Sequence, residues 1–149
     1  EYYNKFFNNL IIVDSSKKKI KYYKKKSYLH LPDKSFLEKI YIGISKSKTK
    51  YILIASDDDF ILPQSVCEGL KFIENKKDYI SAGGEFFSIE NYRSFFKYKK
   101  MYSSHYHSYE NENILNRVKK ISQSHPQMVY YLYNKKLILK FIKKFIKIK

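Results

Sequence analysis

The residues that bear most directly on chemistry are three consecutive carboxylates, Asp57, Asp58 and Asp59. They follow residues 51–56, an isoleucine-rich apolar run that predicts a strand buried on both faces. In open α/β sheets, ligands bind beyond the carboxyl ends of the strands. Adjacent acids repel one another, and their oxygens are the ligands that Mg²⁺ and Mn²⁺ prefer. The sequence therefore predicts a site for a divalent cation and a phosphorylated ligand.

A second interpretation of the same residues needs no ligand. Acidic residues are common at helix starts, where they satisfy free backbone N–H groups and complement the helix dipole. Pro63 is well placed to open a helix just after the aspartates. The aspartates would then only cap that helix, and both interpretations stay open at this point.

The elements around the aspartates alternate between short apolar strands and amphipathic helices, which predicts one α/β domain over residues 1–149. Ser35 and Glu38 have the spacing of a capping box, which predicts a helix start. Strands are expected at residues 10–13, 20–23, 51–56, 78–83, 85–90 and 128–133, and helices from Ser35, from Pro63, over 113–123 and over 135–149. Residues 91–111 are expected to form a long loop. In the helix that follows, Ile114, Leu115, Val118 and Ile121 are expected to face inward.

Composition limits the class of protein. The chain has 149 residues, 44% of them hydrophobic, which is enough for one domain with a core. The formal charge is +16, but Arg93 and Arg117 are the only arginines, the lysines are spread along the chain and no nucleic-acid-binding module is visible. The single cysteine, Cys67, excludes an intrachain disulfide and fits a reducing compartment. We therefore expect a cytoplasmic protein and argue against a nucleic-acid partner.

The last fifteen residues, 135–149, have a basic amphipathic pattern. Such a helix can lie on an anionic membrane surface, which would make the protein peripheral at the inner face of the membrane. It can equally be a terminal helix that packs on the sheet and keeps its lysines in solvent. No apolar run reaches the ~18–20 residues that a membrane span needs.

The segment 57–63, Asp-Asp-Asp-Phe-Ile-Leu-Pro, resembles the Asp-x-Asp region of glycosyltransferases with the GT-A fold, and is most similar to family 2-type enzymes. Residues 10–16 resemble an earlier strand of that family, and Gly83-Gly84 resembles the break after the next strand. The resemblance covers residues 10–90. It implies an α/β fold with a Rossmann-like, mostly parallel sheet flanked by helices. Because only residues 1–9 precede the first matching strand, it also implies a fragment without its N-terminal strand–helix unit.

The same resemblance implies an activity: metal-dependent transfer of a sugar from a nucleotide-diphosphate donor to a glycan or lipid-linked acceptor, in surface glycan or polysaccharide biosynthesis. Asp59 would be the direct ligand of Mn²⁺ or Mg²⁺, and Asp57 would lie near the ribose or the metal. Asp58, also in the nucleotide site, would either point away or orient its neighbours. Asp14 would accept a hydrogen bond from the nucleobase, although an aspartate before Ser-Ser is also ordinary turn chemistry.

Inverting transfer also needs a general base, whose pKa should be tuned toward the working pH. The candidates are Glu85, Glu110 and Glu112, although the last two also suit the start of a helix. Arg117 is a candidate clamp for the diphosphate or a solvated helix residue. His125 is a candidate extra metal ligand, as the resemblance implies.

Three other functions stay open. A sugar nucleotidyltransferase also uses carboxylates and a metal, although no Gly-rich phosphate loop is found near the first strand. A basic nucleic-acid-binding domain would account for the +16 charge. A truncated transferase without activity would keep the motif and lose the reaction.

Overall fold

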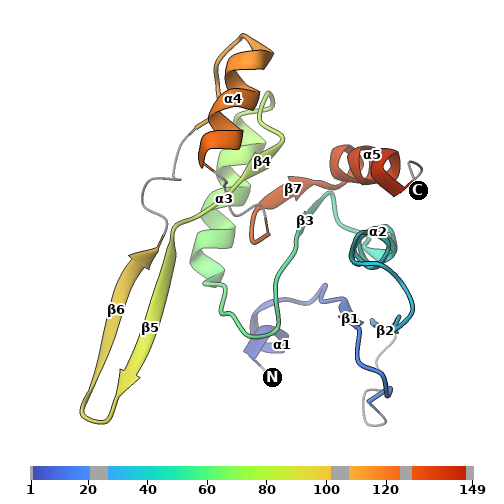
Figure 1. Cartoon of the computed structure of the whole chain (residues 1–149), viewed down its shortest axis with the longest axis vertical. Helices are drawn as coiled ribbons and strands as arrows, with labels where there is room; N and C mark the ends of the chain where they lie inside the picture. Colours follow the sequence, from blue (N-terminus) through green and yellow to red (C-terminus); the bar gives the residue numbers. More distant parts are fainter. Residues whose placement is uncertain (1, 21–26, 102–107, 125–128, 147–149) are drawn as a thin grey trace.

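The computed structural model describes residues 2–20, 27–101, 108–124 and 129–146 (Figure 1). In chain order its elements are α1 (Tyr2–Phe6), β1 (Ile12–Asp14), β2 (Tyr28–His30), α2 (Phe36–Lys46), β3 (Tyr51–Leu53), α3 (Pro63–Asn75), β4 (Ser81–Ala82), β5 (Phe86–Tyr92), β6 (Phe95–Met101), α4 (Ile114–Ser124), β7 (Leu132–Asn134) and α5 (Lys135–Ile146). No helix in these ranges combines the length and the apolar content that crossing a membrane requires.

The strands form three small sheets. The expectation of a mostly parallel, Rossmann-like GT-A sheet is therefore wrong. β1 and β2 make a parallel pair, β3, β7 and β4 make an antiparallel sheet in that order, and β5 and β6 make an antiparallel hairpin. Among the described strands, only β1 and β2 run parallel as neighbours. The chain remains a mixed α/β protein.

The position of β7 explains the difference. β3, α3 and β4 follow one another as a parallel crossover unit would, but β3 and β4 do not pair. β7 lies between them, and Leu132 pairs with both Leu53 and Ala82. Because β7 runs against both neighbours, the alternation of strands and helices along the chain does not become a parallel sheet.

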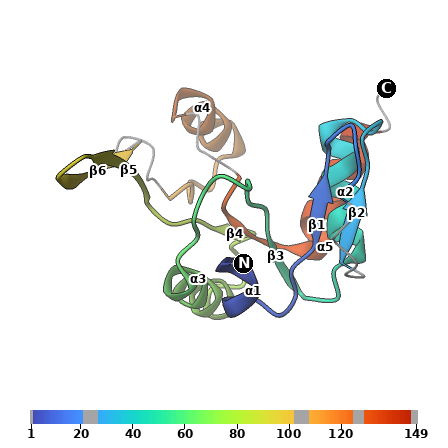
Figure 2. The same cartoon turned by 90° about the horizontal axis from the view of Figure 1, so that it is seen from below.

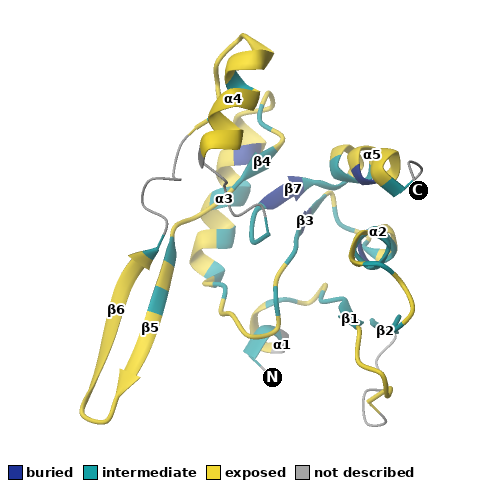
Figure 3. Cartoon of the chain, viewed as in Figure 1, coloured by how far each residue is buried: buried dark blue, intermediate teal, exposed yellow. Residues whose placement is uncertain are grey.

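The core lies where α2, β3, β7 and α5 meet. Its buried residues are Ile44, Ile52, Tyr133 and Ile142, one from each element. Ile52 is the only buried residue of β3, so the expectation of a strand buried on both faces is wrong. Figure 3 shows that the buried residues lie in these four elements and in part of α3, while α4 and the β5–β6 hairpin are mostly exposed.

Local signals are confirmed in the helices around this core. The capping box at the start of α2 forms, with Ser35 N–H donating to Glu38 Oε2 at 2.9 Å and Glu38 N–H donating to Ser35 Oγ at 3.4 Å. α3 begins at Pro63, as its sequence predicts. A helix beginning at Lys135 is also confirmed, while residues 147–149 lie outside the described ranges.

Two expectations about the middle of the chain are wrong. The expected loop over residues 91–111 contains the end of β5 and all of β6, a seven-residue strand with full antiparallel register. The apolar face of α4 does not face inward: Leu115 is 76% exposed and Val118 57% exposed. The predicted strands at 20–23 and 128–133 fall partly on residues 21–26 and 125–128, which lie outside the described ranges. In the described part of the second, residues 129–133, the strand begins only at Leu132.

Candidate functional site

The three aspartates, called here the acidic loop, lie in the irregular segment between β3 and α3 and are all exposed. The Asp58 carboxylate accepts a hydrogen bond from the Ser56 hydroxyl, which lowers the Asp58 pKa. Asp57 has no hydrogen-bond or ion-pair partner within the described part of the chain. The loop therefore presents negative charge to solvent without neutralising it internally.

Asp59 is held by a residue from the other end of the chain. The Tyr130 hydroxyl donates to Asp59 Oδ2, and the Tyr130 backbone N–H donates to the Ile54 carbonyl at 2.7 Å. Burial, followed by the hydrogen bond to Asp59 and its negative charge, raises the Tyr130 pKa to about 12. Tyr130 thus keeps its proton and remains a donor to Asp59 at neutral pH.

Helix α1 supports the loop from the other side. The Tyr3 hydroxyl donates to the Asp59 carbonyl, and the Tyr2 hydroxyl donates to the Ile61 carbonyl at 3.1 Å. The rings of Tyr2 and Phe60 meet edge to face, 5.2 Å apart. Figure 1 shows α1 beside the bend that leads from β3 to α3. None of these tyrosines was expected at the site, because 16 tyrosines in the chain offer no signal that singles them out.

The helix-capping interpretation of the acidic loop is not supported. The N-cap of α3 is Leu62, and no side chain makes a capping hydrogen bond there. The carboxylates of Asp58 and Asp59 bond instead to Ser56 and Tyr130. The aspartates are therefore available for another role.

Asp14 belongs to a different part of the structure. It ends β1, in the separate β1–β2 pair, and no hydrogen bond joins it to the acidic loop among the described residues. Its carboxylate accepts hydrogen bonds from the Tyr28 hydroxyl, from Ser16 N–H at 2.8 Å and from Ser16 Oγ at 2.9 Å, which lower its pKa to about 2. These are the contacts of a turn, so the structure does not bring Asp14 and the acidic loop together.

Among the candidate bases, Glu85 is the one connected to the acidic loop. It precedes β5 and forms an ion pair with Lys100 of β6. Its neighbour Phe86 meets the Tyr130 ring edge to face at 5.3 Å. Asp59, Tyr130 and Phe86 thus form a continuous line of contacts that ends beside Glu85.

Glu110 and Glu112 lie elsewhere. Glu110 accepts hydrogen bonds from the hydroxyls of Ser108 and Tyr79, which lower its pKa. The Tyr79 ring packs on Phe72, in the last part of α3, at 4.9 Å. The acidic loop precedes the first turn of α3, a helix of 13 residues that is about 20 Å long, so Glu110 lies near the opposite end of this helix. Glu112 precedes α4 in the same region and makes no capping bond; Asn113 Oδ1 accepts from Leu115 N–H at 2.9 Å.

Arg117 is half-buried on α4, and Figures 1 and 2 both show α4 well away from α1 and from the bend that leads from β3 to α3. The structure therefore does not bring Arg117 to the acidic loop. His125 lies outside the described residues.

A metal ion fits the acidic loop only if a bound molecule, such as a phosphate, supplies some of the atoms that coordinate the ion. Within the described ranges, no group of three or more His, Cys, Asp or Glu side chains is arranged to hold a metal ion. Mg²⁺, however, usually keeps several waters and is bound through one or two carboxylates together with phosphates. No described residue donates to Asp57 or to Asp59 Oδ1, so these carboxylate oxygens remain available as such ligands.

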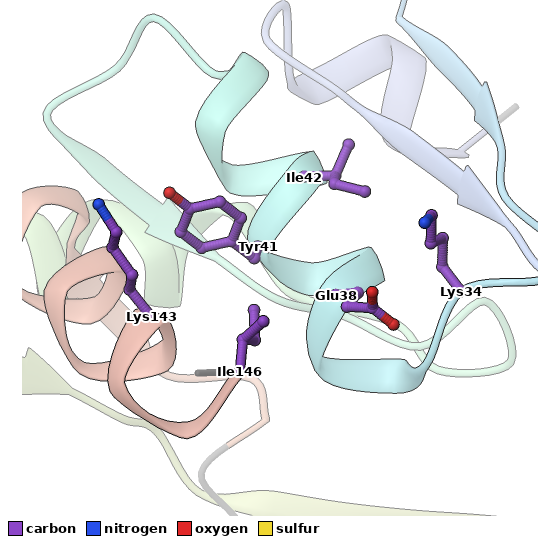
Figure 4. Close-up of a pocket in the computed structure, with 6 residues that line it drawn as sticks. All are labelled: Lys34, Glu38, Tyr41, Ile42, Lys143 and Ile146. Carbon is purple, nitrogen blue, oxygen red and sulfur yellow. The ribbon is translucent and has the colours of Figure 1, made fainter. Parts of the chain in front are cut away.

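A pocket of about 300 Å³ lies away from the acidic loop, between α2 and α5. Figure 4 shows that its lining comes from these two helices and from the turn before α2; the residues are Lys34, Glu38, Tyr41, Ile42, Lys143 and Ile146. None of the predicted site residues lines this pocket.

Comparison of the chain with protein-family models, with curated proteins and with solved structures finds no match in any of the three. The likeness to glycosyltransferases therefore rests on the short segments themselves, above all on residues 57–63.

Proposed function

We propose that the acidic loop binds the diphosphate of a nucleotide-sugar through Mg²⁺ or Mn²⁺, and that the chain acts as a metal-dependent glycosyltransferase or as part of one. The observation that carries the proposal is the state of the three aspartates: they are exposed, they do not cap α3, and tyrosines from α1 and from the segment before β7 hold the loop in place. The proposal depends on this local arrangement and on the motif, and not on a parallel sheet.

Each residue of the loop has a role in this proposal. Asp57 and Asp59 supply carboxylate oxygens, and a divalent cation held there neutralises charge on the leaving diphosphate. Tyr130 is a positioning residue, because its hydroxyl holds Asp59 Oδ2 and leaves Oδ1 without a donor among the described residues. Asp58 remains bonded to Ser56 and keeps the backbone of the loop in shape.

Glu85 is the base that we propose for the acceptor hydroxyl. The line of contacts from Asp59 through Tyr130 and Phe86 brings the hairpin end that carries Glu85 toward the loop. Glu110 suits the role less, because its lowered pKa makes it a weaker base. Lys100 pairs with Glu85 Oε1, so the other carboxylate oxygen, Oε2, would accept the proton.

Calorimetric titration of nucleoside diphosphates and nucleotide-sugars, with and without Mn²⁺, tests the proposal. We expect metal-dependent binding that Asp57→Asn and Asp59→Asn each weaken at least tenfold, because each change removes a charged ligand. Asp33→Asn is the matched control, since Asp33 is also exposed but lies before α2. Binding that needs no metal, or that all three variants weaken equally, would contradict the proposal.

The products separate the proposed reaction from its closest alternative. A glycosyltransferase releases nucleoside diphosphate from a nucleotide-sugar, whereas a sugar nucleotidyltransferase releases pyrophosphate from a nucleoside triphosphate and a sugar phosphate. We expect the first product and not the second.

A further inference from the structure

Helix α5 carries two apolar stripes, and only one of them is used by the fold. Ile142 is buried against Ile44, Ile52 and Tyr133, and its helix neighbours Ile138 and Ile146 pack against the same cluster. α5 and α2 lie side by side, as Figures 1 and 2 show. Ile138, Ile142 and Ile146, called here the inner stripe, therefore make α5 part of the core.

The second stripe, called here the outer stripe, consists of Leu137, Phe141 and Phe145. These residues are 44%, 55% and 47% exposed. Their spacing of four places them in one row along the helix, and the rings of Phe141 and Phe145 lie 4.8 Å apart. Three large apolar side chains thus form a continuous exposed row that the fold does not cover.

A row of lysines runs beside the outer stripe. Lys136, Lys140 and Lys144 are also spaced by four, and each precedes one residue of the outer stripe. All three are exposed, and none forms an ion pair within the described part of the chain. Because α5 contains no acidic residue, its outer face combines apolar contact with uncompensated positive charge.

We propose that the outer stripe and the lysine row dock α5 on an anionic lipid surface. Phe and Leu side chains enter the boundary between headgroups and acyl chains, and lysines beside them meet the negative headgroups. An anionic lipid surface thus offers a partner both to the apolar outer stripe and to the lysine row. The inference goes beyond the proposed function and does not depend on the acidic loop.

Two other occupants satisfy only part of this face. A second copy of the chain, docked through the outer stripe, would bring two rows of lysines close together, and each chain has a formal charge of +16. A nucleic acid would use the lysines but leave Leu137 without an apolar partner. Charge and apolar area together therefore favour an anionic lipid surface.

The test is flotation of the full chain with two kinds of vesicle. One contains phosphatidylcholine alone, and the other also contains phosphatidylglycerol as about one lipid in three, which gives a strong negative surface potential. We expect binding only to the anionic vesicles, and weaker binding as salt rises. Replacing Lys136, Lys140 and Lys144 by Gln should weaken binding roughly a hundredfold, since each basic residue near the surface contributes about a factor of five. Circular dichroism confirms that the variants fold.

Matched controls locate the surface. Replacing Lys17, Lys18 and Lys19 by Gln removes the same charge from exposed positions after β1 and should change binding less than threefold, since charges away from the docked face are screened. Phe141→Gln with Phe145→Gln should abolish binding, while Phe95→Gln with Phe96→Gln, which removes two exposed rings from the hairpin, should not.

Three results would overturn the inference. The first is equal loss in the α5 variants and their controls, which would indicate a general charge effect. The second is a dimer, detected by light scattering, that Phe141→Gln with Phe145→Gln abolishes. The third is binding to single-stranded RNA, but not to vesicles, that depends on Lys136, Lys140 and Lys144.

Discussion

Tyr130 and Asp59 are separated by 71 positions in the chain, yet the Tyr130 hydroxyl donates to the Asp59 carboxylate. Tyr130 has a φ of 70°, the only positive φ among the described non-glycine residues. A bulky residue in the left-handed region is strained. The strained backbone and the hydrogen bond together place the tyrosine between the acidic loop and Phe86.

The first prediction concerns the ionisation of Tyr130. Asp59→Asn should lower its pKa from about 12 toward the ordinary value of 10.0, because the variant removes the negative charge that opposes ionisation. Burial is the larger cause and persists, so the decrease should be partial. NMR titration of ¹³C-labelled tyrosine rings measures it, and Tyr130→Phe assigns the signal. An unchanged pKa would show that the hydrogen bond to Asp59 does not form in solution.

The second prediction concerns acid. The Asp14 pKa is lowered to about 2, so ionised Asp14 stabilises the folded state at pH values above the unfolded pKa of about 3.9. This contribution is lost as the pH falls from about 4 to about 2. The difference in urea midpoint between the wild type and Asp14→Asn should therefore be constant above pH 4 and approach zero near pH 2. A difference that does not change with pH would contradict the turn contacts of Asp14.

The third prediction separates the two stripes of α5. Ile142→Ala should lower the free energy of unfolding by about 2–4 kcal/mol, because Ile142 is 4% exposed and the change leaves a cavity. Phe141→Ala should cost less than about 1 kcal/mol, since Phe141 is 55% exposed. Urea unfolding measures both. Equal costs would mean that Phe141 also packs within the protein.

The fourth prediction uses two adjacent glycines. A Cβ at Gly83 would lie 2.2 Å from Tyr131 Cε1, whereas a Cβ at Gly84 would have no atom within 4 Å. Tyr131 stacks on Tyr133 of the core, so it cannot move away freely. Gly83→Ala should therefore destabilise the fold by about 1–3 kcal/mol, and Gly84→Ala should change stability by less than about 0.5 kcal/mol. Thermal unfolding compares the two variants.

The helices show what local sequence determines. Ser35 and Glu38 form their capping box with groups three residues apart, and Pro63 opens α3 through its own restricted φ. Such signals act within one turn of chain and need no information about the rest of the protein. The exposed acidic loop was also evident from sequence, because three adjacent carboxylates have no place in a core.

The sheet order and the partners of the site were decided only by the tertiary structure. Leu132 pairs with both Leu53 and Ala82, so β7 separates two strands that their order along the chain suggested were neighbours. The contact of Tyr130 with Asp59 and the division of α5 into a buried and an exposed stripe depend on the same placement of the C-terminal segment. A periodic apolar pattern indicates that one face of a helix is apolar. Whether that face is buried depends on which other elements of the fold pack against it. For this reason the sequence determined that α4 and α5 are amphipathic helices, and only the fold determined that Ile142 is buried while Leu115 and Phe141 remain in water.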